Sequence, residues 1–290
     1  MRKDTLYVSD LDGTLLDTTA NISDNSRAML AEAIHSGAMF TVATARTPAT
    51  VHPIMAGLPS PAFTDTATGI RQALPAIVMT GAATWDRTLE RYDTVRLIPA
   101  EYVAPILDAF DRAGLRPFTY CLSGERFLNV YHTRAMDRRE ETFYRERRHL
   151  QLKRFHLDQQ PASPANVVLF FATGPDTQVE HACRLLNEAT PCAAAWYRDI
   201  VTPSTGLVDI YAPGVSKARA VQELAARTGA RRIVVFGDNL NDLPMMREAD
   251  VAVAVANAFP QVKESADVVI GPNTADSVAL FIEKDTGIQL

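Results

Sequence analysis

The stretch LYVSDLDGTLL, residues 6–16, decides the fold. Its first four residues, Leu6 to Ser9, predict a buried strand, and two aspartates follow close to the end of that strand. Open parallel sheets bind ligands at the edge formed by the carboxyl ends of their strands. Alternation along an extended chain would send Asp10 and Asp12 to the same side, into one pocket. Two carboxylates in one pocket repel each other unless a cation is present, so we expect a hard divalent metal ion there.

Short apolar runs alternate with helical patterns along both ends of the chain. In residues 24–36, apolar side chains recur at helical spacing, and Gly37 marks the end of that helix. The predicted strands are residues 6–9, 40–43, 76–79, 208–211, 233–236, 251–255 and 268–270, and a further helix is predicted at residues 216–227. Strands that alternate with helices form right-handed βαβ units. The sequence therefore predicts an α/β fold with a doubly wound parallel sheet, to which both ends of the chain contribute.

Residues 82–208 differ from the flanking parts in pattern and in charge. They contain 16 Lys and Arg and 16 Asp and Glu, whereas the flanking parts contain 13 and 18, so the flanking parts carry the whole net charge of −5. The order of predicted elements is also less regular there, with a strand at residues 166–172 among helices. We therefore predict that an α+β domain, residues 82–208, is inserted into a core of residues 1–81 and 209–290.

Composition and charge exclude several classes of protein. With 47% hydrophobic and 22% charged residues, the 290-residue chain has an ordinary globular composition. Its apolar runs are far shorter than the ~18 residues that span a bilayer, and its charged N-terminus leaves no secretory segment, so we expect a cytoplasmic protein. Cys121, Cys183 and Cys192 lack the spacing of a disulfide framework or a zinc site. The negative net charge argues against nucleic acid or an anionic membrane as a partner.

Further polar residues follow other predicted strands, at the same edge of the sheet. The segment GDNLND, residues 237–242, would bring Asp238 and Asp242 beside the first acidic pair. Thr44 offers a hydroxyl and neighbouring backbone N–H groups to an oxyanion, and Lys217 adds positive charge near a helix start. Each segment alone is compatible with an ordinary turn or a solvated helix. Their occurrence at successive strand ends predicts a metal site with phosphate donors, and Mg²⁺ is the expected ion.

These residues resemble, in order along the chain, the four motifs of the haloacid dehalogenase superfamily, and they are most similar to its Cof-type (subclass IIB) phosphatases. The motifs are DLDGTLL (residues 10–16), Thr44-Ala45-Arg46, Lys217 and GDNLND (residues 237–242). The run before Lys217, residues 208–216, is also similar to the Cof-type pattern. The resemblance implies a Rossmann-like core, with the long insertion forming a C2-type cap that selects the substrate.

The resemblance also implies a magnesium-dependent phosphatase that forms an aspartyl-phosphate. Asp10 would attack phosphorus, and Asp12 would protonate the leaving group and later deprotonate the attacking water. Mg²⁺ would be held by the Asp10 carboxylate, the Asp12 backbone carbonyl and Asp238, with Asp242 in support. The implied phosphate-binding residues are Thr44, Ala45, Lys217 and Asn241, and Lys217 is also expected to be catalytic.

The chain departs from the family pattern at three positions. Ala45 and Ala218 stand where the family commonly has glycine, and Thr80 stands where it has asparagine before the Gly-Ala that opens the cap. These changes remove no catalytic side chain. The predicted function is hydrolysis of small phosphorylated metabolites such as sugar phosphates. Two alternatives are a sugar phosphomutase with the same intermediate and a regulatory module that accepts a phosphoryl group without turnover.

A charged run within the predicted cap has two interpretations. Residues 134–154 contain eight basic and four acidic side chains. The run is compatible with a face that docks an anion. The i,i+4 spacing of Glu141 and Arg145 is equally typical of a solvated helix, which is the interpretation that we favour.

Overall fold

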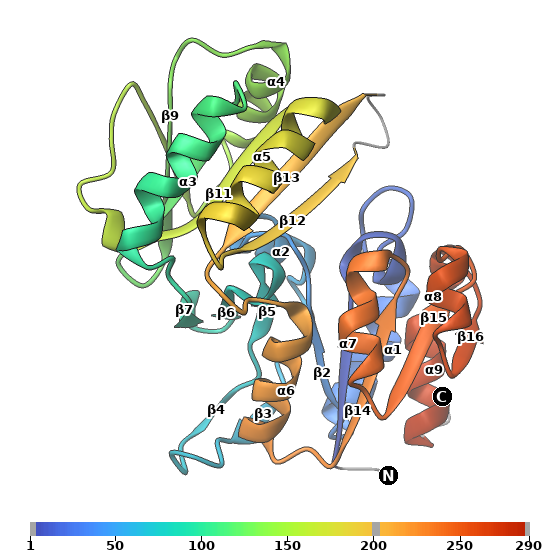
Figure 1. The fold of residues 1–290 in the computed structure, drawn as a ribbon. Coiled ribbons are helices and arrows are strands. Elements are labelled where there is room, and N and C mark those ends of the chain that lie inside the picture. Colours follow the sequence, from blue (N-terminus) through green and yellow to red (C-terminus); the bar gives the residue numbers. More distant parts are fainter. Residues whose placement is uncertain (1–3, 199–203, 288–290) are drawn as a thin grey trace. The chain divides into compact units, whose positions relative to one another are not determined.

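The computed structural model describes residues 4–198 and 204–287, and the chain divides into two compact units. Unit 1 consists of Met1–Thr94 and Ser216–Leu290, and unit 2 consists of Val95–Val215. The two ends of the chain, blue and red in Figure 1, therefore build unit 1 together, whereas the middle of the chain builds unit 2.

Unit 1 contains a five-stranded parallel sheet with the strand order β16-β15-β14-β1-β2. The strands are β1 (Thr5–Ser9), β2 (Met39–Val42), β14 (Arg232–Gly237), β15 (Val251–Val255) and β16 (Val268–Ile270). All five residues of β1 are buried, because the strand lies between β14 and β2 and helices cover the sheet. The parallel sheet confirms the predicted α/β fold class.

Helices flank both faces of this sheet in a doubly wound arrangement (Figure 1). α1 packs against α9, and α6 packs against α7. The helices of unit 1 are α1 (Asp24–His35), α2 (Pro48–Ile54), α6 (Lys217–Thr228), α7 (Leu243–Arg247), α8 (Pro260–Glu264) and α9 (Ser277–Thr286). α6 begins after Ser216, whose hydroxyl accepts a hydrogen bond from the Arg219 N–H, and ends at Gly229 in the left-handed conformation. The cap at Ser216 fixes the start of α6 and therefore the position of Lys217, its first residue.

Smaller strands extend unit 1 beyond its main sheet. β5 (Ala76–Val78), β6 (Ala83–Asp86) and β7 (Arg91–Val95) form a three-stranded sheet, and β3 (Ala62–Thr64) pairs with β4 (Arg71–Ala73). A parallel bridge between Ala43 and Ile77 connects β5 to the end of β2. The short turns of the unit are Leu11–Leu15, Met79–Gly81, Leu240–Asp242 and Asn273–Ala275.

Unit 2 has an α+β architecture around a six-stranded sheet with the order β10-β9-β8-β11-β13-β12. The strands are β8 (Phe118–Ser123), β9 (Phe127–His132), β10 (Lys153–Leu157), β11 (Val167–Pro175), β12 (Ala193–Arg198) and β13 (Thr205–Tyr211). The helices are α3 (Ala100–Arg112), α4 (Arg138–Arg147) and α5 (Asp176–Ala189), and a short turn covers Pro164–Asn166. α3 and α5 pack against each other, whereas α4 connects β9 to its parallel neighbour β10.

Two predicted strands of the core lie outside the five-stranded sheet. Residues 76–79 were expected in it, but Ala76–Val78 form β5, which pairs antiparallel with β6 and meets the end of β2 at a parallel bridge. Residues 208–211 were expected in the parallel sheet, but they belong to β13, which pairs antiparallel with β11 and β12 in unit 2. A short apolar run suits a buried strand in either sheet, and its partner is decided by long-range pairing rather than by the run itself. The main sheet of unit 1 therefore resumes with β14.

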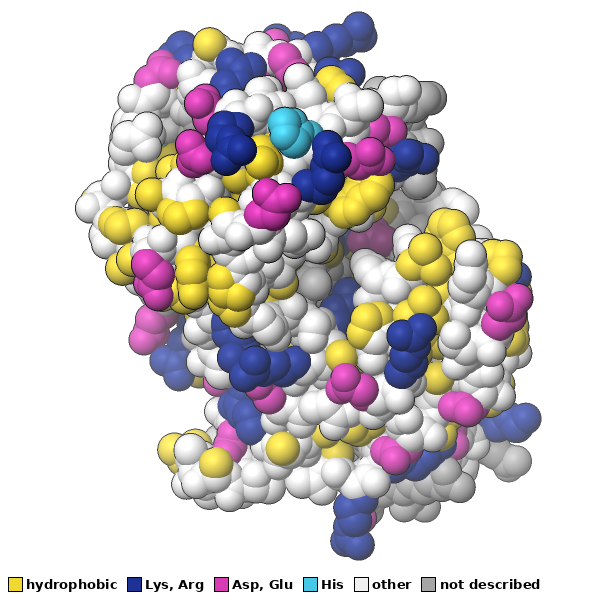
Figure 2. Space-filling view, in the orientation of Figure 1, with side chains coloured by type: hydrophobic (Ala, Val, Ile, Leu, Met, Phe, Trp, Pro, Cys, Tyr) yellow, Lys and Arg dark blue, Asp and Glu magenta, His cyan; other side chains and the backbone are white. Residues whose placement is uncertain are grey.

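Three further features concern the charges on the surface, the apolar length of the helices and the cysteines. On the face drawn in Figure 2, basic and acidic side chains are interspersed. None of the helices in the described ranges, 4–198 and 204–287, is long and apolar enough to cross a bilayer. Cys121, Cys183 and Cys192 are buried free thiols.

Candidate active site

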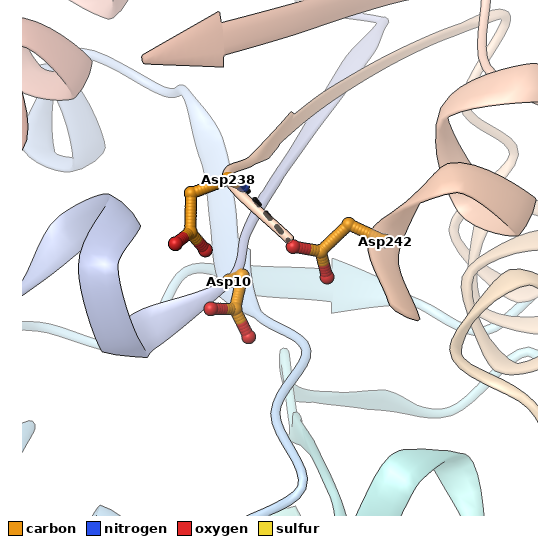
Figure 3. Close-up of side chains that lie close together, drawn as sticks. All are labelled: Asp10, Asp238 and Asp242. Carbon is orange, nitrogen blue, oxygen red and sulfur yellow. Dashed lines mark hydrogen bonds between the residues drawn. The ribbon is translucent and has the colours of Figure 1, made fainter. Parts of the chain in front are cut away.

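Three aspartates converge at the carboxyl edge of the parallel sheet in unit 1. β1 and β14 are neighbours in register, with Ser9 opposite Phe236, and the Asp10 N–H donates to the Phe236 carbonyl at 3.0 Å. Asp10 and Asp238 therefore follow adjacent strands at the same edge. Together with Asp242 they each offer one carboxylate oxygen, and these oxygens lie within 4.8 Å of one another (Figure 3).

Lys217 joins two of these carboxylates. Its Nζ lies 2.6 Å from Asp10 Oδ1 and 2.8 Å from Asp242 Oδ1, and its side chain is 2% exposed. Asp242 is held in turn by the backbone, because its Oδ2 accepts hydrogen bonds from the N–H groups of Asp238 and Asn239, each at 3.2 Å. One of these bonds is drawn in Figure 3. The lysine is thus fixed from two sides in a buried, charged environment.

The charges of this cluster are unbalanced, since three carboxylates face a single ammonium group. Burial, with help from Asp242 and Asp238, raises the pKa of Asp10 to about 7 even though Lys217 opposes the shift. Burial and Asp242 raise the pKa of Asp238 to about 6. Burial alone would lower the pKa of Lys217, but Asp10 and Asp242 raise it overall, so the lysine stays charged. The two remaining negative charges match a divalent cation.

The backbone of the first motif is shaped around Asp238. Gly13 has φ +76°, and a Cβ atom there would collide with the Asp238 carboxylate, so a larger residue would be excluded by both conformation and space. Thr14 Oγ1 donates to Asp238 Oδ1 at 3.1 Å, and Asn257 Nδ2 donates to the Gly13 carbonyl at 2.7 Å. Gly13, Thr14 and Asn257 therefore position the first motif against the fourth.

The carboxylate of Asp12 lies outside the cluster of three. It is exposed and pairs with the guanidinium of Arg46, whose Nε donates to Asp12 Oδ2 at 2.7 Å while Nη2 donates to Oδ1. This two-pronged pairing orients the carboxylate. Asp12 is still close enough to Asp238 to contribute to the raised pKa of that group. The side chains of Asp10 and Asp12 thus have separate partners, Lys217 for one and Arg46 for the other.

The predicted phosphate-binding residues occupy two positions around this edge. Thr44 is 1% exposed and follows β2 after the bridge residue Ala43. Its N–H donates to the Ile77 carbonyl, and its hydroxyl accepts a hydrogen bond from the Arg46 N–H at 3.2 Å. Ala45 follows in the same turn and is half-buried. Asn241 is exposed in the turn Leu240–Asp242. Both segments start at carboxyl ends of parallel strands.

Three residues around the site had no assigned role from sequence. Arg46 stands in the motif Thr44-Ala45-Arg46. Its position just beyond a strand end could have predicted that its guanidinium pairs with a carboxylate at the same edge of the sheet. Thr14 and Asn257 carried no such signal, because their contacts depend on loop conformations.

Comparison with known proteins identifies the family. The sequence model of the haloacid dehalogenase-like hydrolases matches residues 7–282. The chain belongs to this family. It is 28% identical to the pyridoxal phosphate phosphatase YbhA of Escherichia coli, over 94% of this chain and 95% of that protein. It is 25% identical to the 5-amino-6-(5-phospho-D-ribitylamino)uracil phosphatase YcsE of Bacillus subtilis, over 96% and 94%.

Solved structures show the same fold. A phosphatase of this superfamily from Bacteroides thetaiotaomicron superposes with a TM-score of 0.75 at 19% identity, covering 98% of this chain and 96% of that one. A subclass IIB sugar phosphatase superposes with a TM-score of 0.72 at 22% identity, covering 98% and 100%. The predicted membership among Cof-type haloacid dehalogenase-like proteins is confirmed, and the chain is a phosphoric monoester hydrolase.

Proposed function

We propose that this hydrolase cleaves phosphate monoesters of small metabolites by way of an aspartyl-phosphate on Asp10. The observation that carries the proposal is the cluster of Asp10, Asp238 and Asp242, the first and last of them buried, with Lys217 joining these two. A carboxylate nucleophile with a fixed ammonium group beside it suits attack on a phosphoryl group, because the ammonium offsets negative charge as the new bond forms.

Asp10 and Asp12 divide the bond-making and the proton transfer. An Asp10 oxygen forms a bond to phosphorus while the ester oxygen departs, and that oxygen takes a proton from Asp12. Water then attacks the same phosphorus, gives its proton to Asp12, and releases inorganic phosphate and the Asp10 carboxylate. Arg46 holds the Asp12 side chain, which limits its motion between the two steps. Lys217, with Thr44, the N–H of Ala45 and Asn241, is proposed to bind the phosphoryl oxygens.

A divalent ion fits the charge and donor types of this cluster, and we propose Mg²⁺. Carboxylate and carbonyl oxygens are the ligands that this ion prefers. Asp10, Asp238 and the Asp12 backbone carbonyl would hold it, with Asp242 in support. When bound, the ion supplies positive charge beside the transferring phosphoryl group. Burial raises the pKa values of Asp10 and Asp238, and the neighbouring carboxylate of Asp242 adds to both shifts, as expected for a cluster of acids that a cation would stabilise.

The type of reaction and the relatives support a proposal for the substrate class. YbhA and YcsE are named for phosphate monoesters that carry a nitrogen heterocycle. We propose that this chain also takes a small phosphorylated metabolite, with the inserted domain acting as the cap that selects the leaving group. The proposed domains are the core, residues 1–81 and 209–290, and the cap, residues 82–208.

A screen of phosphorylated metabolites for phosphate release tests the proposal directly. Release should require Mg²⁺, stop with EDTA, and be suppressed by Ca²⁺, whose looser coordination would misplace the nucleophile. Full activity after exhaustive removal of metal would contradict the metal assignment. Product analysis separates the rivals: an isomeric phosphate ester marks a mutase, and phosphorylation of the protein without turnover marks a regulatory module.

A further inference from the structure

The helix α4 and the strands β11 and β13 of unit 2 line a cavity of about 830 Å³. This volume is in the range of pockets that bind small organic molecules. Every residue that lines the cavity belongs to unit 2, and none of them belongs to the catalytic cluster described above. The side chains on its two walls therefore indicate what kind of ligand unit 2 binds by itself.

One wall of the cavity is a single side of α4. Its residues recur every four positions along the helix, in the two rows 138, 142, 146 and 139, 143, 147. Phe143 is the apolar side chain of these rows, and its ring stacks on that of Phe171 in β11 with the centroids 4.3 Å apart. The other five positions hold Arg, Thr or Glu, where a helix packed into a core has apolar residues. α4 therefore contacts the sheet through the Phe143 ring and leaves a polar cavity beside it.

The other wall is one face of the sheet. Thr173 pairs with Leu207, and Pro175 pairs with Thr205, so the side chains of Thr173, Leu207 and Thr205 project from the same face as that of Phe171. Thr173 is 5% exposed. Within residues 4–198 and 204–287, the structure gives the Thr173 hydroxyl no hydrogen bond. A buried hydroxyl without a partner is costly, so its place in a cavity wall indicates a ligand atom opposite it.

Positive charge is in excess around the cavity, because three arginines and one glutamate line it. Glu146 offsets one of the arginines, since its Oε2 lies 2.6 Å from Arg147 Nη1. The guanidinium of Arg147 also lies over the Phe143 ring, 4.2 Å from the centroid. Arg147 and Glu146 thus form a neutral pair, and the excess charge belongs to the other two arginines.

Those two arginines, Arg138 and Arg139, lie at the start of α4. Arg139 Nε donates to Thr205 Oγ1 at 3.1 Å, which fixes this guanidinium against β13, and its Nη1 lies 3.7 Å from Asp137 Oδ2. The guanidinium of Arg138 has no ion pair and no hydrogen bond within the described ranges. One cation is therefore held in place beside the sheet, and the next one along the chain is free to bind an anion.

The opposite side of α4 has a different arrangement of charges. Arg145 and Glu141 are exposed, and Arg145 Nη2 lies 2.7 Å from Glu141 Oε1. Neither residue lines the cavity. The interpretation of a solvated helix, favoured from the sequence, thus describes this pair, whereas the excess positive charge lies on the side of α4 that lines the cavity.

We propose that this cavity binds a small organic anion, with Arg138 and Arg139 binding its carboxylate or phosphate head and the Thr173 hydroxyl donating to the same head. Guanidinium groups bind both kinds of head through paired N–H donors. The apolar body of the ligand lies against Phe171 and Leu207. The inference goes beyond the proposed function and does not rest on it, because no catalytic group takes part.

Titration calorimetry of the full chain in EDTA tests the site. Without a metal ion, the acidic cluster of Asp10, Asp238 and Asp242 repels anions, so the titration excludes binding there. The probes are 2-naphthoate, 2-naphthylphosphonate and the neutral 2-naphthamide, which share one ring system. At least one of the two anions should bind about tenfold or more tightly than the amide, and the tighter anion identifies the preferred head.

Variants locate the binding. Arg138→Met and Arg139→Met should each weaken binding of the tighter anion about fivefold or more, and Thr173→Val about threefold. Arg145→Met is the matched control, because it removes the same charge from the same helix on the side of Glu141, and it should change the affinity by less than about twofold. Circular dichroism checks folding. Arg138 has no partner in the described ranges, so its replacement breaks no contact of the fold.

Three results would overturn the site. The first is that neither anion binds more tightly than 2-naphthamide. The second is an unchanged affinity in folded Arg138→Met and Arg139→Met. The third is an equal loss in Arg145→Met, which would assign the effect to the overall charge of unit 2. Because the titration involves no turnover, its result is independent of whether the chain releases phosphate from any ester.

Discussion

Lys217 has two structural roles in the geometry of the site. It neutralises the charge of Asp10, the proposed nucleophile, and it ties the turn that carries Asp242 to the end of β1. A buried ion pair that loses one partner leaves an uncompensated charge, which is costly. Substitutions of the aspartates and of the lysine therefore affect folding as well as chemistry, so every activity measurement needs a folding control.

Asp10→Asn should reduce kcat to less than about a tenth of the wild-type value, because an amide is a poor nucleophile toward phosphorus. The amide keeps the shape of the side chain, so the variant should fold. Steady-state phosphate release measures the effect. Asp24→Asn, an exposed acid at the start of α1, is the control and should keep full activity. A folded Asp10→Asn enzyme above this level would remove Asp10 from the role of nucleophile.

Asp12→Ala should slow both halves of the reaction, since one carboxyl group is proposed to act first as acid and then as base. Each role is typically worth about 10²–10⁴-fold in rate. Rapid-quench measurement of leaving-group release and of aspartyl-phosphate decay separates the halves. If release slows while decay of the intermediate keeps its wild-type rate, a group other than Asp12 activates the water.

At the scale of elements, strand order accounts for what the sequence predicted and what it did not. Asp10 and Asp238 were predicted to meet because carboxyl ends of parallel strands share one edge, and β1 and β14 are indeed neighbours. The pairing of residues 208–211 with β11 was not predictable, because an apolar run does not specify its partner strand. The contacts of Gly13 and Thr14 with Asp238 were not predictable either, because they depend on the geometry of the turn.

The burial of Lys153 in unit 2 was missed for a related reason. Lys153 appeared in the sequence as part of a charged run typical of a solvated helix, residues 134–154. Only the register of β10 with β9 and β8 turns it inward over Tyr120. Helical periodicity describes α4 correctly, but it does not extend to the strand that follows. Residues whose role depends on non-local pairing are therefore the ones that sequence patterns leave unassigned.

The burial of Lys153 predicts that Lys153→Met is more stable than the wild type by an amount that depends on pH. The pKa of Lys153 is about 7 in the folded chain and about 10.4 in an unfolded one, so the folded state binds fewer protons between these values. Wild-type stability therefore rises with pH across this window, and the cost of burying the ammonium is greatest below about pH 7. Urea denaturation should show Lys153→Met to be more stable than the wild type at pH 6, with a smaller difference at pH 9.

The charges of Arg147 and Asp209 also favour the wild type over Lys153→Met more at pH 9 than at pH 6. Arg147 repels the protonated lysine, and Asp209 becomes a charged partner only above its own pKa of about 7. Removal of the lysine thus stabilises the fold less at pH 9 than at pH 6. Arg154→Met, on the same strand, should show no such pH dependence. A loss of stability in Lys153→Met of equal size at both pH values would mean that the lysine serves the core through its aliphatic chain.

At the scale of the whole molecule, the sequence predicted an insertion because the charge balance of residues 82–208 differs from that of the flanks. The contact-defined units divide at Thr94 and at Ser216, whereas the cap was drawn from charge and pattern as residues 82–208. β6 and β7 account for the difference at the first boundary, since they continue the sheet that β5 begins. At the second boundary, β13 remains in the sheet of unit 2. Strand pairing therefore sets both contact boundaries.

The contact-defined boundaries specify a deletion that tests the proposed division of labour. Replacing Val95–Val215 with a short Gly/Ser linker keeps every proposed catalytic group, including Asp10, Lys217 and Asp238, within unit 1. The truncated protein should hydrolyse p-nitrophenyl phosphate slowly in the presence of Mg²⁺, because an activated leaving group needs little assistance. Its discrimination among natural phosphate esters should collapse, since the groups proposed to contact the leaving group are gone.

Circular dichroism and a cooperative melt must first show that the truncated protein is folded, because exposed apolar surface favours aggregation. Asp10→Asn in the truncated chain is the control for contaminating phosphatase and should abolish the residual rate. The ranking of substrates by kcat/KM then decides the question. A folded unit 1 that keeps the wild-type ranking would locate specificity in the strand-end loops around Thr44 and Asn241, and unit 2 would have no part in choosing the substrate.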